Sequence, residues 1–278
     1  MVINCLYYLL FGDIFVILQL KSADISILSR KKTKKIMKTF RTTILAAFVM
    51  MSAAVNAQEV TSSDADSKVE VTIGADFVSR YIWRGQDCGY AAVQPELGIS
   101  YKGLSLTAWG NYGIANVDDI EELDLTLSYN AGGLTVGITD YWFGNQYVDY
   151  FRYKAHETAH VFEANLGYDF GPLSLNWYTN FAGCDGCNKS DERAYSSYVE
   201  ATAPFTLGGL DCEASIGAVP YATSYYADAN GFAVTNISVK AAKEFSVAKN
   251  LKMPVFAQLA ANPSTQKMYL VLGVGIHY

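Results

Sequence analysis

Apolar and polar residues alternate along most of the chain beyond residue 70. In the segment 123–130, Leu123, Leu125, Leu127 and Tyr129 are separated by polar residues. A period of two is typical of a strand with one apolar face, because successive side chains of a strand point to opposite faces. The same period recurs in the segments 104–108, 134–138, 162–168, 173–177 and 251–259. The pattern therefore predicts an all-β protein.

Short and long connections alternate between these segments. The short ones are rich in glycine and other residues that favour tight turns, and they are centred on 102–103, 131–133, 171–172, 207–209 and 247–250. The long, polar ones span about 85–91, 113–121, 144–156, 183–193, 220–231 and 262–266. Transmembrane barrels have short periplasmic turns and longer outer loops. Six long and five short connections predict an antiparallel up-and-down transmembrane β-barrel of about twelve strands, in contact with outer-membrane lipid.

The C-terminal segment carries a second barrel signal. Leu270, Leu272, Val274, Ile276 and Tyr278 share one face of a strand that ends on an aromatic residue. This pattern resembles the terminal signal by which outer-membrane barrels are recognised, and it predicts the barrel-assembly machinery as a partner.

A secretory signal precedes the strands. Residues 37–57 have a basic start, an apolar stretch and small residues before Gln58, which predicts a signal peptide. Residues 58–67 are expected to be a mobile periplasmic tail and residues 68–278 the barrel. Residues 1–36 are interpreted as an over-extended start or dispensable leader. The alternative is a membrane anchor, but Asn4, Asp13 and Gln19 interrupt its apolar run at a cost in lipid.

Composition and charge narrow the function. The chain is 51% hydrophobic, 14% aromatic and 17% charged, which excludes a disordered chain. Residues 1–57 hold eight of the 21 basic and two of the 27 acidic residues, which leaves 13 against 25 and a formal charge of −12. Nucleic acid is excluded as a partner, because its binding needs a basic surface.

The strand parity assigns side chains to the two faces of the barrel. Inward parity collects the expected pore-lining residues Asp76, Arg80, Arg84, Glu96, Asp124, Glu163, Glu200, Glu213 and Lys240. With further inward residues this makes eight acids against four bases, which predicts a polar lumen with a mild cation preference. The alternative is a closed interior in which these charges pair with one another.

Outward parity places aromatic residues near the strand ends, where membrane interfaces attract them. The expected interface girdle comprises Tyr81, Trp83, Tyr101, Tyr129, Trp142, Tyr168 and Tyr278. Asp140 does not fit, because it falls on the lipid side and would need a bulge or an exit from the membrane.

The first predicted strand and the segment after it resemble a known family of proteins. Its sequence Asp-Phe-Val-Ser-Arg-Tyr-Ile-Trp-Arg-Gly over 76–85, followed by Val-Gln-Pro-Glu-Leu over 93–97, resembles the opening of the TorF-like porin family of small Gram-negative outer-membrane barrels. The resemblance implies a barrel in the cell outer membrane and no established substrate. Arg80 and Arg84 are expected inside the mouth, where they either pair with Asp76 or Glu96 or contact a solute.

A zinc motif offers a different function. His156, Glu157 and His160 form H-E-x-x-H, in which two histidines bind zinc from one face of a helix and the glutamate acts as a general base. In a strand, residues four apart lie roughly 13 Å from each other, too far to share one ion. Because the sequence alternates directly after His160, the motif is interpreted as a coincidence, and no metal or other cofactor is expected.

Of the cysteines that follow the signal peptide, Cys88, Cys184 and Cys187 lie in predicted long loops and Cys212 lies near a short turn. Cys184 and Cys187 lie close together in one long loop, and in an exported protein they are candidates for a local disulfide. Half of a zinc site is the alternative. Cys88 and Cys212 are expected to be free because they lie toward opposite ends of the barrel.

These observations predict a non-enzymatic outer-membrane channel for passive diffusion of small hydrophilic solutes. The alternatives are a non-conducting structural or adhesive surface barrel and, more remotely, a zinc hydrolase at His156, Glu157 and His160.

Overall fold

A computed structural model describes residues 69–115, 121–144, 149–154 and 157–278. The segments expected as leader, signal peptide and periplasmic tail lie outside these ranges. All described residues belong to one compact unit, Asp64–Tyr278. No helix in the described ranges is long and apolar enough to cross a bilayer.

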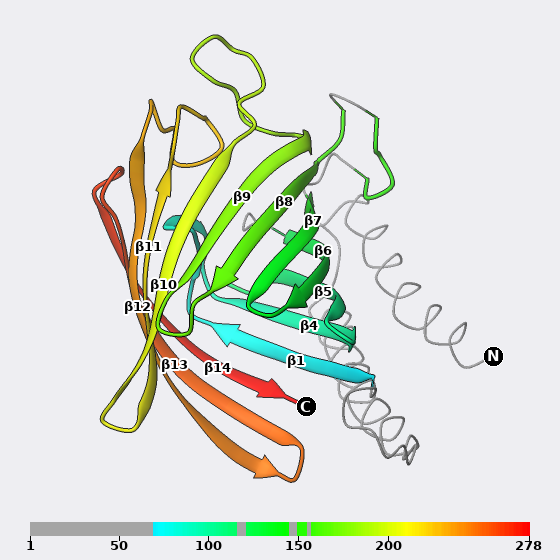
Figure 1. Cartoon of the computed structure of the whole chain (residues 1–278), viewed down its shortest axis with the longest axis vertical. Coiled ribbons are helices and arrows are strands. Elements are labelled where there is room, and N and C mark those ends of the chain that lie inside the picture. The colour runs from blue at the N-terminus through cyan, green and yellow to red at the C-terminus, as the bar shows by residue number, and fades with distance from the viewer. Residues whose placement is uncertain (1–68, 116–120, 145–148, 155–156) are drawn as a thin grey trace, which may run out of the picture. The chain divides into compact units, whose positions relative to one another are not determined.

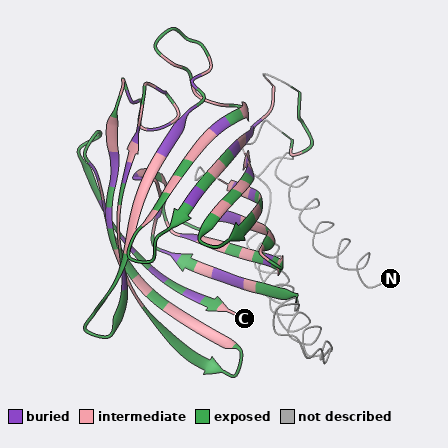
Figure 2. Ribbon diagram, in the orientation of Figure 1, coloured by how far each residue is buried: buried purple, intermediate pink, exposed green. Residues whose placement is uncertain are grey.

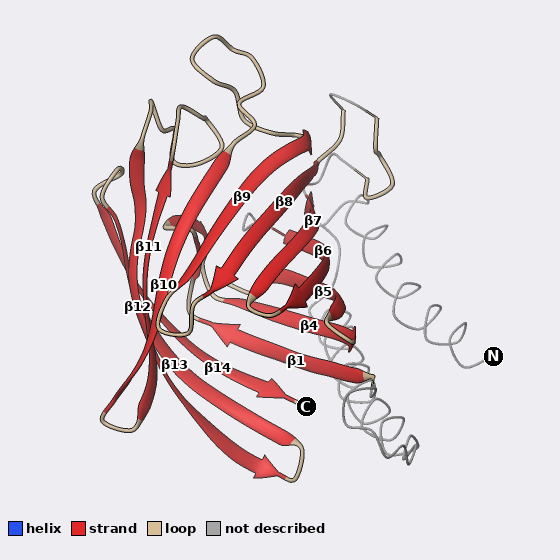
Figure 3. Ribbon diagram, viewed as in Figure 1, coloured by secondary structure: helices blue, strands red, loops and turns tan. Residues whose placement is uncertain are grey.

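Twelve strands close into one antiparallel barrel (Figures 1 and 3). They are β1 (Glu70–Val78), β4 (Ala92–Tyr101), β5 (Leu104–Gly113), β6 (Glu121–Ala131), β7 (Leu134–Gly144), β8 (His160–Asp169), β9 (Ser174–Gly183), β10 (Ser197–Leu207), β11 (Leu210–Val219), β12 (Ala233–Ala248), β13 (Leu251–Asn262) and β14 (Lys267–His277). Each strand pairs with its neighbours along the chain, and β1 closes the barrel against β14. The predicted all-β class and strand number are confirmed.

Two further strands form a hairpin outside the barrel ladder. Among the strands that the structure describes, β2 (Tyr81–Trp83) pairs only with β3 (Gln86–Gly89). This hairpin lies within the first long connection, between β1 and β4.

The short connections are tight turns whose backbone requires positive φ. Lys102 and Gly103 have φ of 49° and 82°, and Gly132 and Gly133 have 56° and 86°. Two consecutive positive φ values are typical of the type I′ turn, whose twist matches that of paired strands. The Lys102–Gly103 and Gly132–Gly133 turns therefore help to fix the register of the two hairpins that they close.

The barrel interior is polar and forms cross-strand hydrogen bonds. The Ser105 and Ser128 hydroxyls lie 2.8 Å apart, and those of Thr126 and Thr139 lie 3.0 Å apart. Burial alternates along strands such as β7 and β14, and Figure 2 shows exposed and less exposed bands along the barrel strands. The register therefore separates a polar inner face from an outer face that stays exposed.

Candidate functional site

The first long connection folds into the barrel. At Ser79 the chain leaves the wall: the Ser79 amide donates to the Leu272 carbonyl at 2.8 Å, and the Leu272 amide donates to the Ser79 hydroxyl at 2.9 Å. The hairpin β2–β3 then turns at Arg84 and Gly85, with φ of 51° and 78°. Two consecutive positive φ values again fit a two-residue turn.

The hairpin touches strands around most of the circumference, which is possible only from inside. The Tyr81 ring lies 5.6 Å from that of Trp109 on β5, and the Trp83 ring lies 5.7 Å from that of Tyr141 on β7. At the tip, the Gly85 carbonyl accepts a hydrogen bond from Asn262 Nδ2 on β13 at 3.0 Å. The hairpin therefore crosses the lumen and narrows it.

A buried ion pair holds the hairpin tip. Arg84 donates from Nη1 to Glu163 Oε2 at 2.5 Å and from Nη2 to Oε1 at 2.9 Å, a bidentate pair. The side chains of Arg84 and Glu163 are only 8% and 2% exposed. Tyr141 donates to Glu163 Oε1 at 2.8 Å and Tyr226 to Oε2 at 3.1 Å, so the carboxylate has four hydrogen bonds. Such extra hydrogen bonds are what makes a buried charge tolerable.

Aromatic rings enclose the Arg84 guanidinium. Its central carbon lies 4.0 Å from the ring centroid of Tyr178, 4.5 Å from Trp83, 4.9 Å from Tyr198 and 5.6 Å from Tyr226. Ring faces attract cations, and the attraction strengthens when water is excluded. A lysine could not replace this arginine, because only the planar fork stacks and pairs bidentately at once.

The charge state of this cluster follows from its surroundings. Burial alone would lower the pKa of the Arg84 guanidinium, but Tyr226 and Glu163 beside it hold that pKa above its ordinary value. Burial, together with nearby Glu163, raises the pKa of the Tyr226 hydroxyl despite the opposing effect of Arg84. Tyr226 therefore stays a neutral hydrogen-bond donor and Arg84 stays charged.

A second polar cluster lies beside β2. Glu122 and Asp124 are 6% and 9% exposed, and neither forms an ion pair with a described residue. Burial raises the pKa of Tyr81, and the neighbouring Glu122 and Asp124 raise it further. Tyr81 is therefore a neutral hydroxyl beside two carboxyl groups, and no cation in the described part of the chain pairs with these groups.

The predicted pore-lining residues near β1 do not form one cluster. His277 Nε2 lies 2.7 Å from Asp76 Oδ1, and Arg80 donates to Asp87 at 2.6 Å. Glu96 lies opposite Trp109 in the strand register. The pairing of Arg80 or Arg84 with Asp76 or Glu96, one of the two sequence alternatives, is wrong. The inward bend at Ser79 carries both arginines away from β1.

The remaining predicted pore-lining residues lie on β10, β11 and β12. Glu200 accepts from the Tyr198 hydroxyl at 2.7 Å. Glu213 and Lys240 are register partners, and the Lys240 ammonium lies 4.3 Å from the ring centroid of Phe256. Arg84 at the hairpin tip forms its ion pair with Glu163 and with none of these three residues.

Tyr81 and Trp83 require a correction. Strand parity predicts them in the lipid-facing girdle, but both belong to the hairpin inside the barrel. Tyr81 is only 8% exposed, and Trp83 packs on the buried tyrosines Tyr198 and Tyr226. The prediction is wrong because parity holds only while the chain stays in the wall.

The other predicted girdle residues lie on barrel strands or at the C-terminus. Tyr101, Tyr129 and Tyr168 are 45%, 48% and 43% exposed at the short-turn end. Trp142 packs against Tyr150 with ring centroids 5.5 Å apart. The Tyr278 hydroxyl accepts from Asn250 Nδ2 at 3.2 Å, close to the turn between β12 and β13.

The zinc motif does not have the geometry of a zinc site. His156 lies outside the described residues, and the residues from Glu157 to His160 are not helical. His160 is fully buried, with Nδ1 2.7 Å from Asp140 Oδ1 and Nε2 2.6 Å from the Tyr150 carbonyl. Both ring nitrogens are thus occupied. The same contact explains Asp140 on the outer face: it needs no bulge, because His160 pairs with it.

The expected bond between Cys184 and Cys187 is absent from the structure, where both are free and exposed thiols. Asp185 between them holds the loop instead. Its carboxylate accepts from the Gly186 amide at 2.7 Å and from the Ser196 amide at 3.1 Å. Cys88 and Cys212 are also free, as the sequence predicts.

Sequence reasoning missed the tyrosines that complete the arginine site. Tyr141, Tyr178 and Tyr198 come from three barrel strands, and Tyr226 comes from the loop after β11. A signal was available, because Tyr141 and Tyr178 each adjoin a tryptophan in a strand, so that one ring of each pair must face inward. No local signal marks Tyr226.

Exposed apolar residues on the outer face of the barrel indicate which solvent surrounds it. Leu106, Leu127, Leu166 and Leu259 are 50%, 51%, 55% and 50% exposed, and similar residues occupy the outward positions of every barrel strand. An apolar band around a closed barrel with a polar interior requires lipid on the outside. The chain is an outer-membrane, porin-like β-barrel.

Comparison with known proteins finds similarity in fold alone. No family model matches the sequence, and no curated protein matches it. Similar solved structures include the NanC porin (TM-score 0.41, 8% identity, 75% of this chain and 99% of that chain), the KdgM porin in complex with disordered oligogalacturonate (0.40, 9%, 76% and 98%) and a Salmonella typhi OmpF complex with daunomycin (0.34, 10%, 77% and 98%). Membership of the TorF-like porin family stays a prediction.

Proposed function

We propose that this porin-like barrel is a passive channel for small hydrophilic solutes, and that the hairpin β2–β3 sets how far it is open. The observation that carries the proposal is a hairpin that crosses a polar lumen and is latched there through Arg84 and Glu163. Twelve strands enclose more space than wall side chains fill, so a displaced hairpin would leave a water-filled path.

A mild cation preference follows from the charges of the lumen. Glu122 and Asp124 lie beside the hairpin without a basic partner among the described residues. Arg84 contributes no free positive charge, because Glu163 neutralises it. Acidic groups that line a pore favour cations over anions.

Planar-bilayer recordings test the channel and its selectivity together. The folded protein is expected to give ohmic current steps. In a KCl gradient, the sign of the reversal potential is expected to show a higher permeability for K⁺ than for Cl⁻. The double variant Glu122→Gln and Asp124→Asn is expected to move that potential toward zero, because it removes the acidic pair beside the hairpin. Anion preference in the unmodified protein would contradict the charge argument.

Silence in a folded, heat-modifiable sample would contradict the channel itself. A structural or adhesive surface barrel would then be the better function. The observation favouring that alternative is the exposed aromatic loops, in which Phe151 is 80% and Phe232 is 74% exposed.

We further propose that β14 is the strand that the barrel-assembly machinery recognises. Its outward residues Leu270, Leu272, Val274 and Ile276 form an unbroken apolar row that continues to Tyr278. Tyr278→Ser is expected to lower the folded, heat-modifiable fraction in outer membranes. Tyr101→Ser, a change of the same type at the same end of the barrel, is the control and is expected to have a smaller effect. Equal effects of the two changes would contradict the proposal.

A further inference from the structure

The barrel wall has an unpaired edge beside β14. The register of β1 with β14 ends at Val78 and Gly273, and Ser79 makes the last contact, to Leu272. β14 continues to Lys267, and among the described strands β13 is its only paired neighbour there. Because backbone groups alternate in direction along a strand, the amide and carbonyl groups of Met268 and Leu270 share the side of the Leu272 amide and carbonyl, facing the missing partner.

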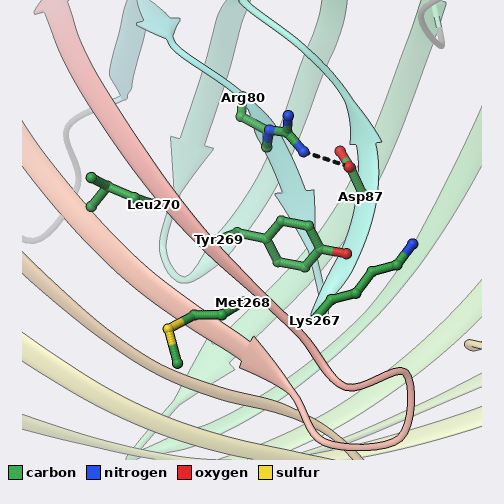
Figure 4. Close-up of a pocket in the computed structure, with 6 residues that line it drawn as sticks. All are labelled: Arg80, Asp87, Lys267, Met268, Tyr269 and Leu270. Atoms are coloured by element: carbon green, nitrogen blue, oxygen red, sulfur yellow. Dashed lines mark hydrogen bonds and ion pairs between the residues drawn. The ribbon is translucent and has the colours of Figure 1, made fainter.

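A hollow of about 530 Å³ lies at this edge. It is lined by Arg80, Asp87, Lys267, Met268, Tyr269 and Leu270. Figure 4 shows Tyr269 and Lys267 directed toward the side of Arg80 and Asp87, whereas Met268 and Leu270 point to the opposite face of β14. The edge therefore has a polar side and an apolar side.

The polar side has a surplus of positive charge. Arg80 donates to Asp87 at 2.6 Å and lies against two rings, 4.8 Å from the Tyr90 centroid and 5.8 Å from that of Tyr269. These contacts hold the guanidinium in place. Lys267 has no acidic partner among the described residues, so two cations face one carboxylate.

The apolar side is open to the membrane. Met268 and Leu270 are 69% and 61% exposed. An open strand edge is not stable in hydrocarbon unless its amides find acceptors, so this edge belongs at the level of the lipid headgroups. A ligand for it needs an anionic, hydrogen-bond-accepting head and an apolar tail.

We propose that this edge binds the phosphate headgroup of an anionic membrane lipid. The phosphate accepts from Arg80, Lys267 and the free β14 amides, and the acyl chain lies along Met268 and Leu270. A neutral or zwitterionic lipid lacks the net charge that complements the two cations.

Native mass spectrometry of the full-length protein in a nonionic detergent tests the proposal with short-chain phosphatidic acid as the probe. One bound lipid per chain is expected, and phosphatidylcholine of the same chain length is expected to bind more weakly. Lys267→Gln is expected to lower the affinity for phosphatidic acid by about tenfold, the size of one charge-assisted hydrogen bond. Lys102→Gln, at an exposed turn outside the hollow, is the matched control and is expected to leave binding unchanged.

Three results would overturn the proposal. Equal binding of phosphatidic acid and phosphatidylcholine would show a general apolar contact. Displacement of phosphatidic acid by inorganic phosphate at the same concentration would show a site for free anions. Displacement of the lipid by a second copy of the chain would show that the edge pairs with another strand. The measurement does not depend on ion conduction, so a silent barrel would not affect it.

Discussion

Glu163→Gln is expected to open the barrel. The substitution leaves the Arg84 guanidinium buried inside the lumen with no opposing charge, and breaking a buried pair in this way costs about 3–5 kcal/mol. This cost destabilises the state in which the hairpin is seated in the lumen. It does not destabilise a displaced hairpin, because water then hydrates the Arg84 guanidinium. The ratio of displaced to seated hairpin is therefore expected to rise by about two orders of magnitude or more. Single-channel recordings should show larger or longer openings than in the unmodified protein.

Two variants make this expectation specific. Glu213→Gln removes a lumen carboxylate of the same charge that does not touch the hairpin, and its openings are expected to resemble those of the unmodified protein. The double variant Arg84→Met and Glu163→Met removes both charges, so the seated hairpin is expected to recover in part. If Glu163→Gln is folded, as shown by heat-modifiable migration, but its conductance is unchanged, the ion pair between Arg84 and Glu163 does not hold the hairpin in the lumen.

Gly85→Ala is the second change with a large expected effect. A Cβ at Gly85 would lie 1.8 Å from the Thr235 carbonyl oxygen, which belongs to the barrel wall and cannot move aside as a flexible side chain could. Gly85 also has a φ of 78°, where an L-residue is strained. The hairpin tip must therefore withdraw from β12, and the channel is expected to stay open longer while the barrel itself remains folded.

Gly132→Ala is the matched control for this change. Gly132 has a φ of 56°, so the backbone strain is similar and costs about 1 kcal/mol, but nothing lies within 4 Å of the added Cβ. The control is expected to lower the unfolding temperature slightly without altering conductance. If both alanine variants conduct alike, the clash with Thr235 does not govern the pore.

The sequence by itself determined the wall of the barrel. Alternation such as that of Leu123, Leu125 and Leu127 assigns each residue of a strand to one face, and the glycine-rich pairs place the turns. Both signals are local, because they depend on neighbours two positions apart or on one residue's φ. For this reason the strand number and the apolar exterior could be predicted without knowing any long-range contact.

Only the tertiary structure decided what fills the barrel. Once the chain bends inward at Ser79, parity no longer says where Tyr81 and Trp83 point. The partner of Arg84 is 79 residues away along the chain at Glu163, and Tyr226 is 142 residues away. Their meeting depends on how the closed wall brings β8 and the loop after β11 to the same depth. No pattern within a single strand encodes that distance across the lumen.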